Sequence, residues 1–134
     1  MPSIPLGIIL QATLPQVPPP AKAVIAALTS GRGRLRSAQQ LAVSLGLRSR
    51  FRLARLLRGA RLPPIRELAD WICVLQLLLE VEGTGVSLQQ IAPSWRVDPP
   101  TCYRLVKRLT GLAWTDVRAA GFTWALLQFL GRAR

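Results

Sequence analysis

The sequence predicts an all-α fold with two tandem helix-turn-helix subdomains joined by a long linker helix, and about seven helices in all. Three observations predict it. Apolar residues recur at helical spacing, and no stretch shows the sustained alternation typical of a strand. Helix start and stop signals bracket the apolar segments. One helix-turn-helix pattern occurs twice along the chain.

The composition favours a binding protein over an enzyme. The chain has 134 residues, 50% of them hydrophobic, which is enough to bury a core without disulfides or metals. Histidine is absent, so histidine-based catalysis and histidine metal sites are excluded. Two cysteines, Cys73 and Cys102, are too few for a zinc site or a disulfide framework. We therefore expect no enzymatic activity, no metal and no cofactor.

The positive charge is unevenly placed along the chain. Lys and Arg total 18 against 6 Asp and Glu, which gives a net charge of +12. Residues 32–66 carry ten arginines and no acid, whereas residues 67–82 carry four acids and no base. Such a field attracts polyanions, nucleic acid first and an anionic membrane surface second. The alternative is that the arginines only keep an apolar protein in solution.

Targeting and membrane signals are weak. The apolar start, residues 4–14, lacks a basic flank and is broken by prolines and a glycine. The most apolar run, residues 71–79, has nine residues, whereas a membrane span needs about 20. We expect a cytoplasmic, nucleoid-associated protein without membrane contact.

Four segments are predicted in order. Residues 1–20 read as a Pro-rich apolar tail, because the prolines exclude a long helix. Residues 21–63 form the first subdomain, which opens with a short helix over residues 21–29. Residues 64–82 form the linker helix, and residues 83–134 form the second subdomain with a C-terminal helix.

An internal repeat supports the two-unit prediction. Residues 37–42 (Ser-Ala-Gln-Gln-Leu-Ala) return as residues 87–92 (Ser-Leu-Gln-Gln-Ile-Ala), 50 positions later. Residues 52–53 return as residues 104–105, 52 positions later, so the turn of the first copy is predicted to be two residues shorter. Chance similarity between two Leu-rich helical segments is the alternative.

Each copy carries the signals of a helix, a tight turn and a second helix. A serine with a glutamine three residues later predicts a capping box, and a glycine ends the second helix. In the two copies these features are Ser37 and Ser87, turns at residues 45–47 and 95–97, and Gly59 and Gly111. The second copy adds Asp98 as N-cap and Pro99 at the first helical position, while Pro93 interrupts its first helix.

The second helix of the second copy carries a polar face suited to the major groove of DNA. With Cys102, Leu105 and Leu109 directed inward, a rotation of 100° per residue places six others on or beside the opposite face. These candidate DNA-binding residues are Pro100, Thr101, Tyr103, Arg104, Lys107 and Arg108. Arg and Lys meet guanine edges or phosphates. The alternative is a solvated basic face on a structural helix.

The corresponding helix of the first copy is less regular but richer in arginine. Taking Leu53, Ala54 and Leu57 as buried leaves a basic outer face, which indicates phosphate binding. Its candidate DNA-binding residues are Arg48, Arg50, Arg52, Arg55 and Arg58, preceded by Arg32, Arg34 and Arg36 in a segment expected to be flexible. Phe51 either points outward, towards a thymine methyl, or lies in the core through a shifted register, which we favour. We expect this copy to be the degenerate member.

The linker and C-terminal helices are rich in apolar residues. The linker carries a broad apolar stripe, and its acids would sit badly against phosphates, so it should face away from DNA. Its length, about 28 Å, is close to the rise of about 34 Å per turn of B-DNA. The C-terminal helix is predicted to begin after Thr115 as N-cap and to run to about Leu130. It either completes the core or presents a patch to a partner.

Two helix-turn-helix units joined by one long helix resemble the DNA-binding domain of AraC/XylS-type transcription regulators. The similarity is clearest at residues 103–112 (Tyr-Arg-Leu-Val-Lys-Arg-Leu-Thr-Gly-Leu) and residues 115–118 (Thr-Asp-Val-Arg). The resemblance implies a sequence-specific regulator of transcription that inserts recognition helices into the major groove of double-stranded DNA. Only 36 residues precede Ser37, so the effector domain usual in that family is not expected.

Other functions stay open at this point. A helical interaction or adaptor protein would use the basic face to bind an acidic partner. A winged-helix regulator would use residues 87–110 alone and need a β-hairpin after Gly111, where the sequence reads as helix. An RNA binder would need more aromatic residues for stacking. The expected partner is double-stranded DNA, with the N-terminal tail or the C-terminal helix as the place for a protein partner or self-association.

Overall fold

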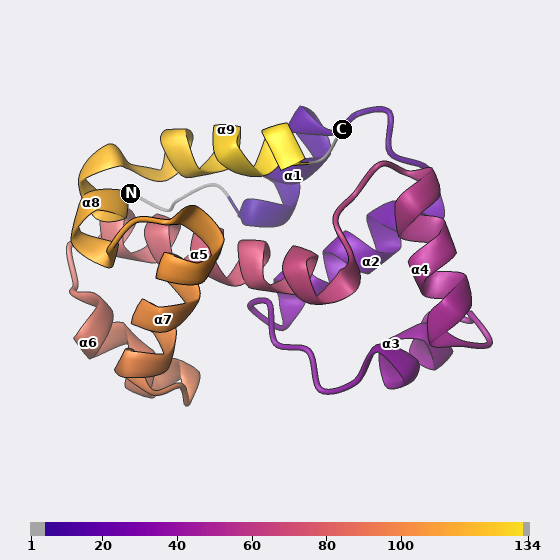
Figure 1. Ribbon diagram of the computed structural model, residues 1–134, viewed down its shortest axis with the longest axis horizontal. Coiled ribbons are helices and arrows are strands. Elements are labelled where there is room, and N and C mark those ends of the chain that lie inside the picture. The colour runs from indigo at the N-terminus through magenta and orange to yellow at the C-terminus, as the bar shows by residue number, and fades with distance from the viewer. Residues whose placement is uncertain (1–4, 133–134) are drawn as a thin grey trace.

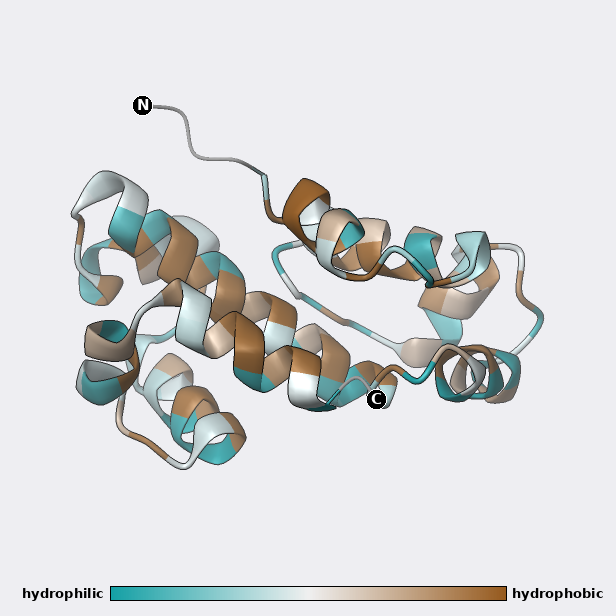
Figure 2. Ribbon diagram, turned by 90° about the horizontal axis from the view of Figure 1, so that it is seen from above, coloured by the Kyte–Doolittle hydropathy of each residue, from teal (hydrophilic) through white to brown (hydrophobic). Residues whose placement is uncertain are grey.

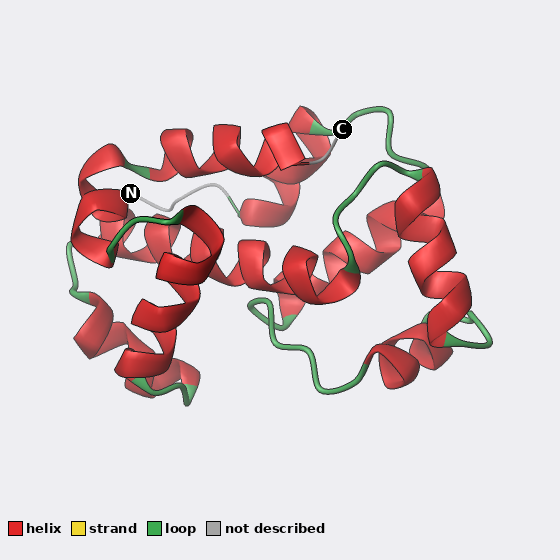
Figure 3. Cartoon of the chain, viewed as in Figure 1, coloured by secondary structure: helices red, strands yellow, loops and turns green. Residues whose placement is uncertain are grey.

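The computed structural model describes residues 5–132, which form nine α-helices and one 3-10 helix and contain no strand (Figures 1 and 3). The predicted all-α class is confirmed. The elements are α1 (Leu6–Thr13), α2 (Pro19–Ser30), α3 (Ala38–Ser44), α4 (Arg50–Gly59), α5 (Ile65–Thr84), α6 (Leu88–Ile91), η1 (Ala92–Trp95), α7 (Pro99–Thr110), α8 (Trp114–Ala120) and α9 (Phe122–Arg132). Two helices more than expected are present, because α1 forms and the predicted C-terminal helix is divided.

The central element is α5, which corresponds to the predicted linker. It has 20 residues, begins after Pro64 and ends at Gly85, whose φ of +72° is left-handed. Its buried residues lie on most of its circumference, as expected of a helix inside a core. Figure 1 shows α9 along one side of α5, with α3, α6 and α7 extending from the other. The sequence placed this helix correctly to within two residues at either end.

Among the described residues, the buried side chains are all hydrophobic. Figure 2 shows hydrophobic residues along the helices that cross the middle of the molecule and hydrophilic ones towards its outer turns. In this part of the chain, no single helix has the length and hydropathy of a bilayer span. Only α5 together with residues 88–95, bent by 106°, meets both criteria.

The expected N-terminal tail contains a helix. Pro5 caps α1, and Leu6 and Leu10 are buried against the body of the protein. Pro18 then caps α2, with Pro19 in its first turn. Proline is tolerated at the start of a helix, where its missing N–H is not needed. The prolines therefore lie at the starts of two short helices and do not prevent helix formation. Residues 1–4 of the predicted tail lie outside the described part of the chain.

The predicted C-terminal helix is two helices. Gly121 has a φ of +94°, and the chain turns there between α8 and α9. Thr115, expected as N-cap, is inside α8, which is capped by Ala113 without a side-chain hydrogen bond. On α9, Ala125 and Phe129 are buried whereas Leu127 is 60% exposed. The helix completes the core with one face, and the Phe129 ring lies 6.1 Å from that of Trp71.

Candidate nucleic-acid interface

Two helix pairs, α3 with α4 and α6/η1 with α7, share one turn geometry. The Leu47 N–H donates to the Ala42 carbonyl at 2.8 Å, and the Val97 N–H donates to the Ala92 carbonyl at 3.1 Å. Both alanines are fully buried, where the two helices meet. The left-handed position of the turn is held by Gly46 in the first pair and by Arg96 in the second. A side chain in this conformation costs about 1–2 kcal/mol, so the second turn is the strained one.

The N-terminal caps differ between the two pairs. Ser87 and Gln90 form the complete capping box, with hydrogen bonds of 3.1 and 3.3 Å. Ser37 caps α3 by accepting from the Gln40 N–H, but the return bond is not made. Instead, the Gln39 side chain accepts a hydrogen bond from the Arg50 N–H at 3.0 Å and joins α3 to α4. The capping box expected in the first copy is therefore only half formed.

The register of the repeat also differs from the sequence prediction. The N-cap residues of α4 and α7 are Ser49 and Asp98, which lie 49 positions apart. The buried residues Leu53 and Leu57 correspond at the same spacing to Cys102 and Val106. The turn of the first copy is thus one residue longer than that of the second, and the predicted shortening by two residues is wrong. Leucine is so frequent in both helices that sequence identity alone selected the wrong register.

Gly59 does not have the predicted role. It is the last residue of α4, and Ala60 is the C-cap. The left-handed position that closes this helix is occupied by Arg61, whose φ is +59°. Gly111, by contrast, is the left-handed C-cap of α7, as expected.

In the corrected register, the outer faces of α4 and α7 carry basic residues at matching positions. Arg55 corresponds to Arg104, and Arg58 corresponds to Lys107. All four side chains are exposed, opposite the buried residues of their helices. Phe51 corresponds to Pro100 on the same faces.

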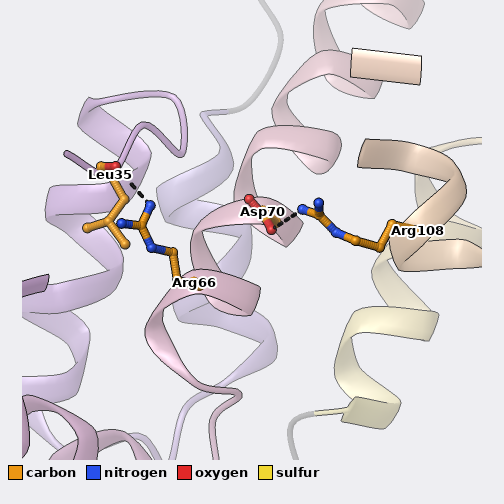
Figure 4. Close-up of polar contacts among 4 residues, drawn as sticks. All are labelled: Leu35, Arg66, Asp70 and Arg108. Atoms are coloured by element: carbon orange, nitrogen blue, oxygen red, sulfur yellow. Dashed lines mark hydrogen bonds and ion pairs between the residues drawn. The ribbon is translucent and has the colours of Figure 1, made fainter. Parts of the chain in front are cut away.

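On α7, the predicted inward face is rotated. Val106 is fully buried, although it was not assigned to that face, and Leu105 and Leu109 are only half-buried. Of the predicted DNA-binding residues, the exposed ones are Pro100, Thr101, Arg104, Lys107 and Arg108, while Tyr103 is half-buried. Arg108 is directed to α5, where its guanidinium lies 2.8 Å from the Asp70 carboxylate (Figure 4).

The five predicted arginines of the first copy are all exposed: Arg48 in the turn before α4, and Arg50, Arg52, Arg55 and Arg58 on α4. Ala54, expected in the core, is exposed as well. Phe51 is 67% exposed, so the favoured placement in the core is wrong. The only ion pairs within residues 5–132 are Arg108–Asp70 and Arg132–Glu67, and therefore none of the five arginines is neutralised.

The acids of α5 are used inside the protein. Glu80 accepts a hydrogen bond from the Trp95 indole N–H at 3.0 Å, and Glu82 accepts one from the Phe122 N–H at 2.8 Å. Glu67 and Asp70 pair with Arg132 and Arg108. Together they hold η1, α7 and both ends of α9 on α5. Sequence reasoning missed these contacts because their partners lie 15 to 65 residues away.

The connecting segment, residues 31–36, was expected to be flexible. In the structure it is docked against the rest of the protein. Gly33 is buried with a φ of +78°, and a Cβ atom there would lie 2.5 Å from the Ala69 carbonyl oxygen. The Arg34 guanidinium donates to the Arg96 carbonyl at 2.9 Å. Arg66 donates to the Leu35 carbonyl at 3.3 Å (Figure 4). The segment before the first pair is thereby fastened to α5 and to the turn of the second pair.

The two cysteines have no features of a reactive site. Burial raises the pKa of Cys73 to about 12, and the nearby Cys102 adds to the shift. Burial, followed by Asp98, also raises the pKa of Cys102. Both thiols stay protonated at neutral pH, whereas nucleophiles and metal ligands are thiolates. Within the described residues, no group of His, Cys, Asp or Glu side chains could hold a metal ion.

The chain was compared with protein-family models, with curated proteins and with solved structures, and none of them matches it. The candidate interface is accordingly defined by this chain's own geometry: two basic outer faces, on α4 and α7, at corresponding positions of two similar turns.

Proposed function

We propose that this protein binds double-stranded DNA in a sequence-specific way and regulates transcription. In this proposal the pairs α3–α4 and α6/η1–α7 are tandem helix-turn-helix subdomains, α4 and α7 are their recognition helices, and α5 is the linker. The matching outer faces carry the proposal, because Arg55 and Arg58 correspond to Arg104 and Lys107. The resemblance to AraC/XylS-type regulators leads to the same expectation.

The electrostatics favour a long polyanion. Ten arginines lie within residues 32–66, which contain no acid, and none of the ten is in an ion pair in the described chain. DNA presents about one negative charge per 1.7 Å of helix axis, so one duplex can meet many separated guanidinium groups. Arginine and lysine also form bidentate contacts with guanine in the major groove.

The arrangement of the pairs favours contact with one face of a duplex. In Figure 1, α3, α6 and α7 lie on the same side of α5, and α4 lies beside one end of it. The length of α5 is about 30 Å at 1.5 Å per residue, and successive major grooves on one face of B-DNA are about 34 Å apart. The Arg34–Arg96 and Glu80–Trp95 hydrogen bonds hold the pairs to the same core.

A salt titration tests the proposal. Fluorescence anisotropy with a labelled duplex should give an affinity that falls by about 10³–10⁵ between 50 and 200 mM salt, as roughly six to ten phosphate contacts would require. The matched control is Arg118→Ala, an exposed arginine on α8 outside both outer faces, which should leave the slope unchanged. A nearly flat salt dependence, or equal affinity for an acidic polypeptide, would contradict DNA binding and favour the adaptor function.

A further inference from the structure

Phe51 is an exposed aromatic residue among the exposed arginines of α4. Its side chain is 67% exposed, and it lies near the start of α4, opposite the buried Leu53 and Leu57. Phenylalanine is more often buried, and aromatic and arginine side chains are both enriched at interfaces, so an exposed ring flanked by arginines is a candidate contact residue. About two thirds of the side chain is therefore open to a partner.

The surroundings of the ring restrict what can bind there. The Arg50 guanidinium lies 5.1 Å from the ring centroid, which is cation–π distance. Arg55 and Arg58 share the outer face of α4 with Phe51, and no acid in the described chain pairs with any of these arginines. A purely apolar partner would leave three guanidinium groups desolvated and unpaired. The occupant must therefore offer an apolar group among many negative charges.

We infer that Phe51 reads a thymine, by placing its ring against the C5-methyl group in the major groove of double-stranded DNA. This inference rests on the proposed function. The thymine methyl is the apolar group that DNA presents in the major groove, and phosphates flank the groove on both sides. The first subdomain then reads a base through Phe51, in addition to the contacts of its arginines. The equivalent position on α7 is Pro100, so the contact is specific to the first subdomain.

Removing the methyl group from the DNA tests the inference without changing the protein. A duplex selected by the wild-type protein from a random pool is resynthesised with deoxyuridine in place of each thymine in turn. One position should lose affinity about fourfold, the value of one buried methyl group. When the Phe51→Ala variant is tested, deoxyuridine at that DNA position should change the affinity less than about 1.5-fold. Leu127→Ala, which removes another exposed apolar residue, on α9, should respond as the wild type does.

The outcomes distinguish a failure of the thymine contact from a failure of the proposed DNA binding. Absence of any salt-dependent duplex binding would overturn both. Duplex binding in which every deoxyuridine position affects wild type and Phe51→Ala equally would overturn the thymine contact alone. Tighter binding of single-stranded RNA that disappears in Phe51→Ala would also overturn it, since the ring would then stack on an unpaired base.

Discussion

The two helix pairs share a turn but differ in how the rest of the protein holds them. The first pair has a glycine in its turn and outer-face arginines without acidic partners. The second has a strained arginine in its turn and a first helix shortened by Pro93 into a 3-10 turn. Its Trp95 and Arg108 are bonded to acids of α5. In the second pair, Trp95 and Arg108 are thus bonded to α5, whereas none of the arginines of α4 has an acidic partner in the described chain.

This comparison bears on one expectation from the sequence, which stays a prediction. The first pair was expected to be the degenerate member, but its turn is the unstrained one and its first helix is uninterrupted. The sequence suggested otherwise because the register was misjudged, which made the turn look too short. We therefore expect the first pair to supply most of the affinity and the second to be the more rigidly positioned reader.

The largest expected effect concerns the connecting segment that fastens the two pairs together. In Gly33→Ala, the new Cβ atom would overlap backbone atoms of α5, at 2.5 Å from the Ala69 carbonyl oxygen and 2.6 Å from the Cys73 nitrogen. We expect the free energy of unfolding to fall by about 3 kcal/mol and the melting temperature by about 10 °C. Thermal unfolding followed by circular dichroism measures both.

Gly46→Ala is the matched control for this substitution. Gly46 has the same φ of +78°, but nothing lies within 4 Å of its Cβ position. The loss there should be only about 1 kcal/mol, from backbone strain alone. Equal losses at the two positions would show that the connecting segment is not docked against α5 as described.

The second prediction separates the contributions of the two outer faces to DNA binding. The double variant Arg55→Ala/Arg58→Ala should reduce the slope of log affinity against log salt by about 2, because two phosphate contacts are lost. Arg104→Ala should instead weaken one or two preferred base positions by about 1–3 kcal/mol. Salt titrations on matched and mismatched duplexes distinguish these results.

Hydroxyl-radical footprinting extends the same comparison to the DNA. The wild-type monomer should protect two patches about 10 base pairs apart on one face of the duplex. In Arg55→Ala/Arg58→Ala one patch should fade. A single patch that persists in the double variant would show that the first pair does not contact DNA.

A smaller effect is expected where the second pair is held by α5. The Arg108 side chain is 68% exposed and that of Asp70 is 30% exposed, so Asp70→Asn should cost less than about 1 kcal/mol of stability. The freed Arg108 guanidinium can then reach a phosphate, and the salt slope should steepen by about 1. An unchanged slope would mean that Arg108 only holds α7 on α5 and does not contact DNA. Glu67→Gln, which breaks the ion pair to α9 instead, is the control.

The sequence predicted the features that depend on neighbouring residues. The helix caps at Ser37, Ser87 and Gly111 were correct, as was the apolar pattern of α5, because short-range hydrogen bonds and helical spacing determine them. Placement of Phe51 and the register of α4 failed, because leucines at several positions allow more than one buried face. Packing against α5 selects among these faces, and it involves residues far away in the chain.

The smallest predicted effect concerns the strained turn of the second pair. Arg96 has a φ of +57°, where a side chain costs about 1–2 kcal/mol, and glycine would remove that cost. Glycine also gains freedom in the unfolded chain, which offsets about 0.5–1 kcal/mol of the benefit. Arg96→Gly should therefore raise the free energy of unfolding by roughly 0.5–1 kcal/mol. The Arg34 hydrogen bond is to the backbone carbonyl, so the substitution leaves it in place.

Arg61→Gly is the matched comparison, because Arg61 has a φ of +59° at the end of α4 and also carries one positive charge. Both variants should be stabilised to a similar degree in denaturant titrations, since the same backbone strain is removed. The DNA affinities of the two variants then show whether either arginine contacts DNA. A loss of affinity for Arg96→Gly alone would indicate that the turn of the second pair contacts a phosphate. If Arg96→Gly instead lowers stability while Arg61→Gly raises it, the Arg96 side chain contributes packing that outweighs its strain, and the second turn is not the weaker of the two.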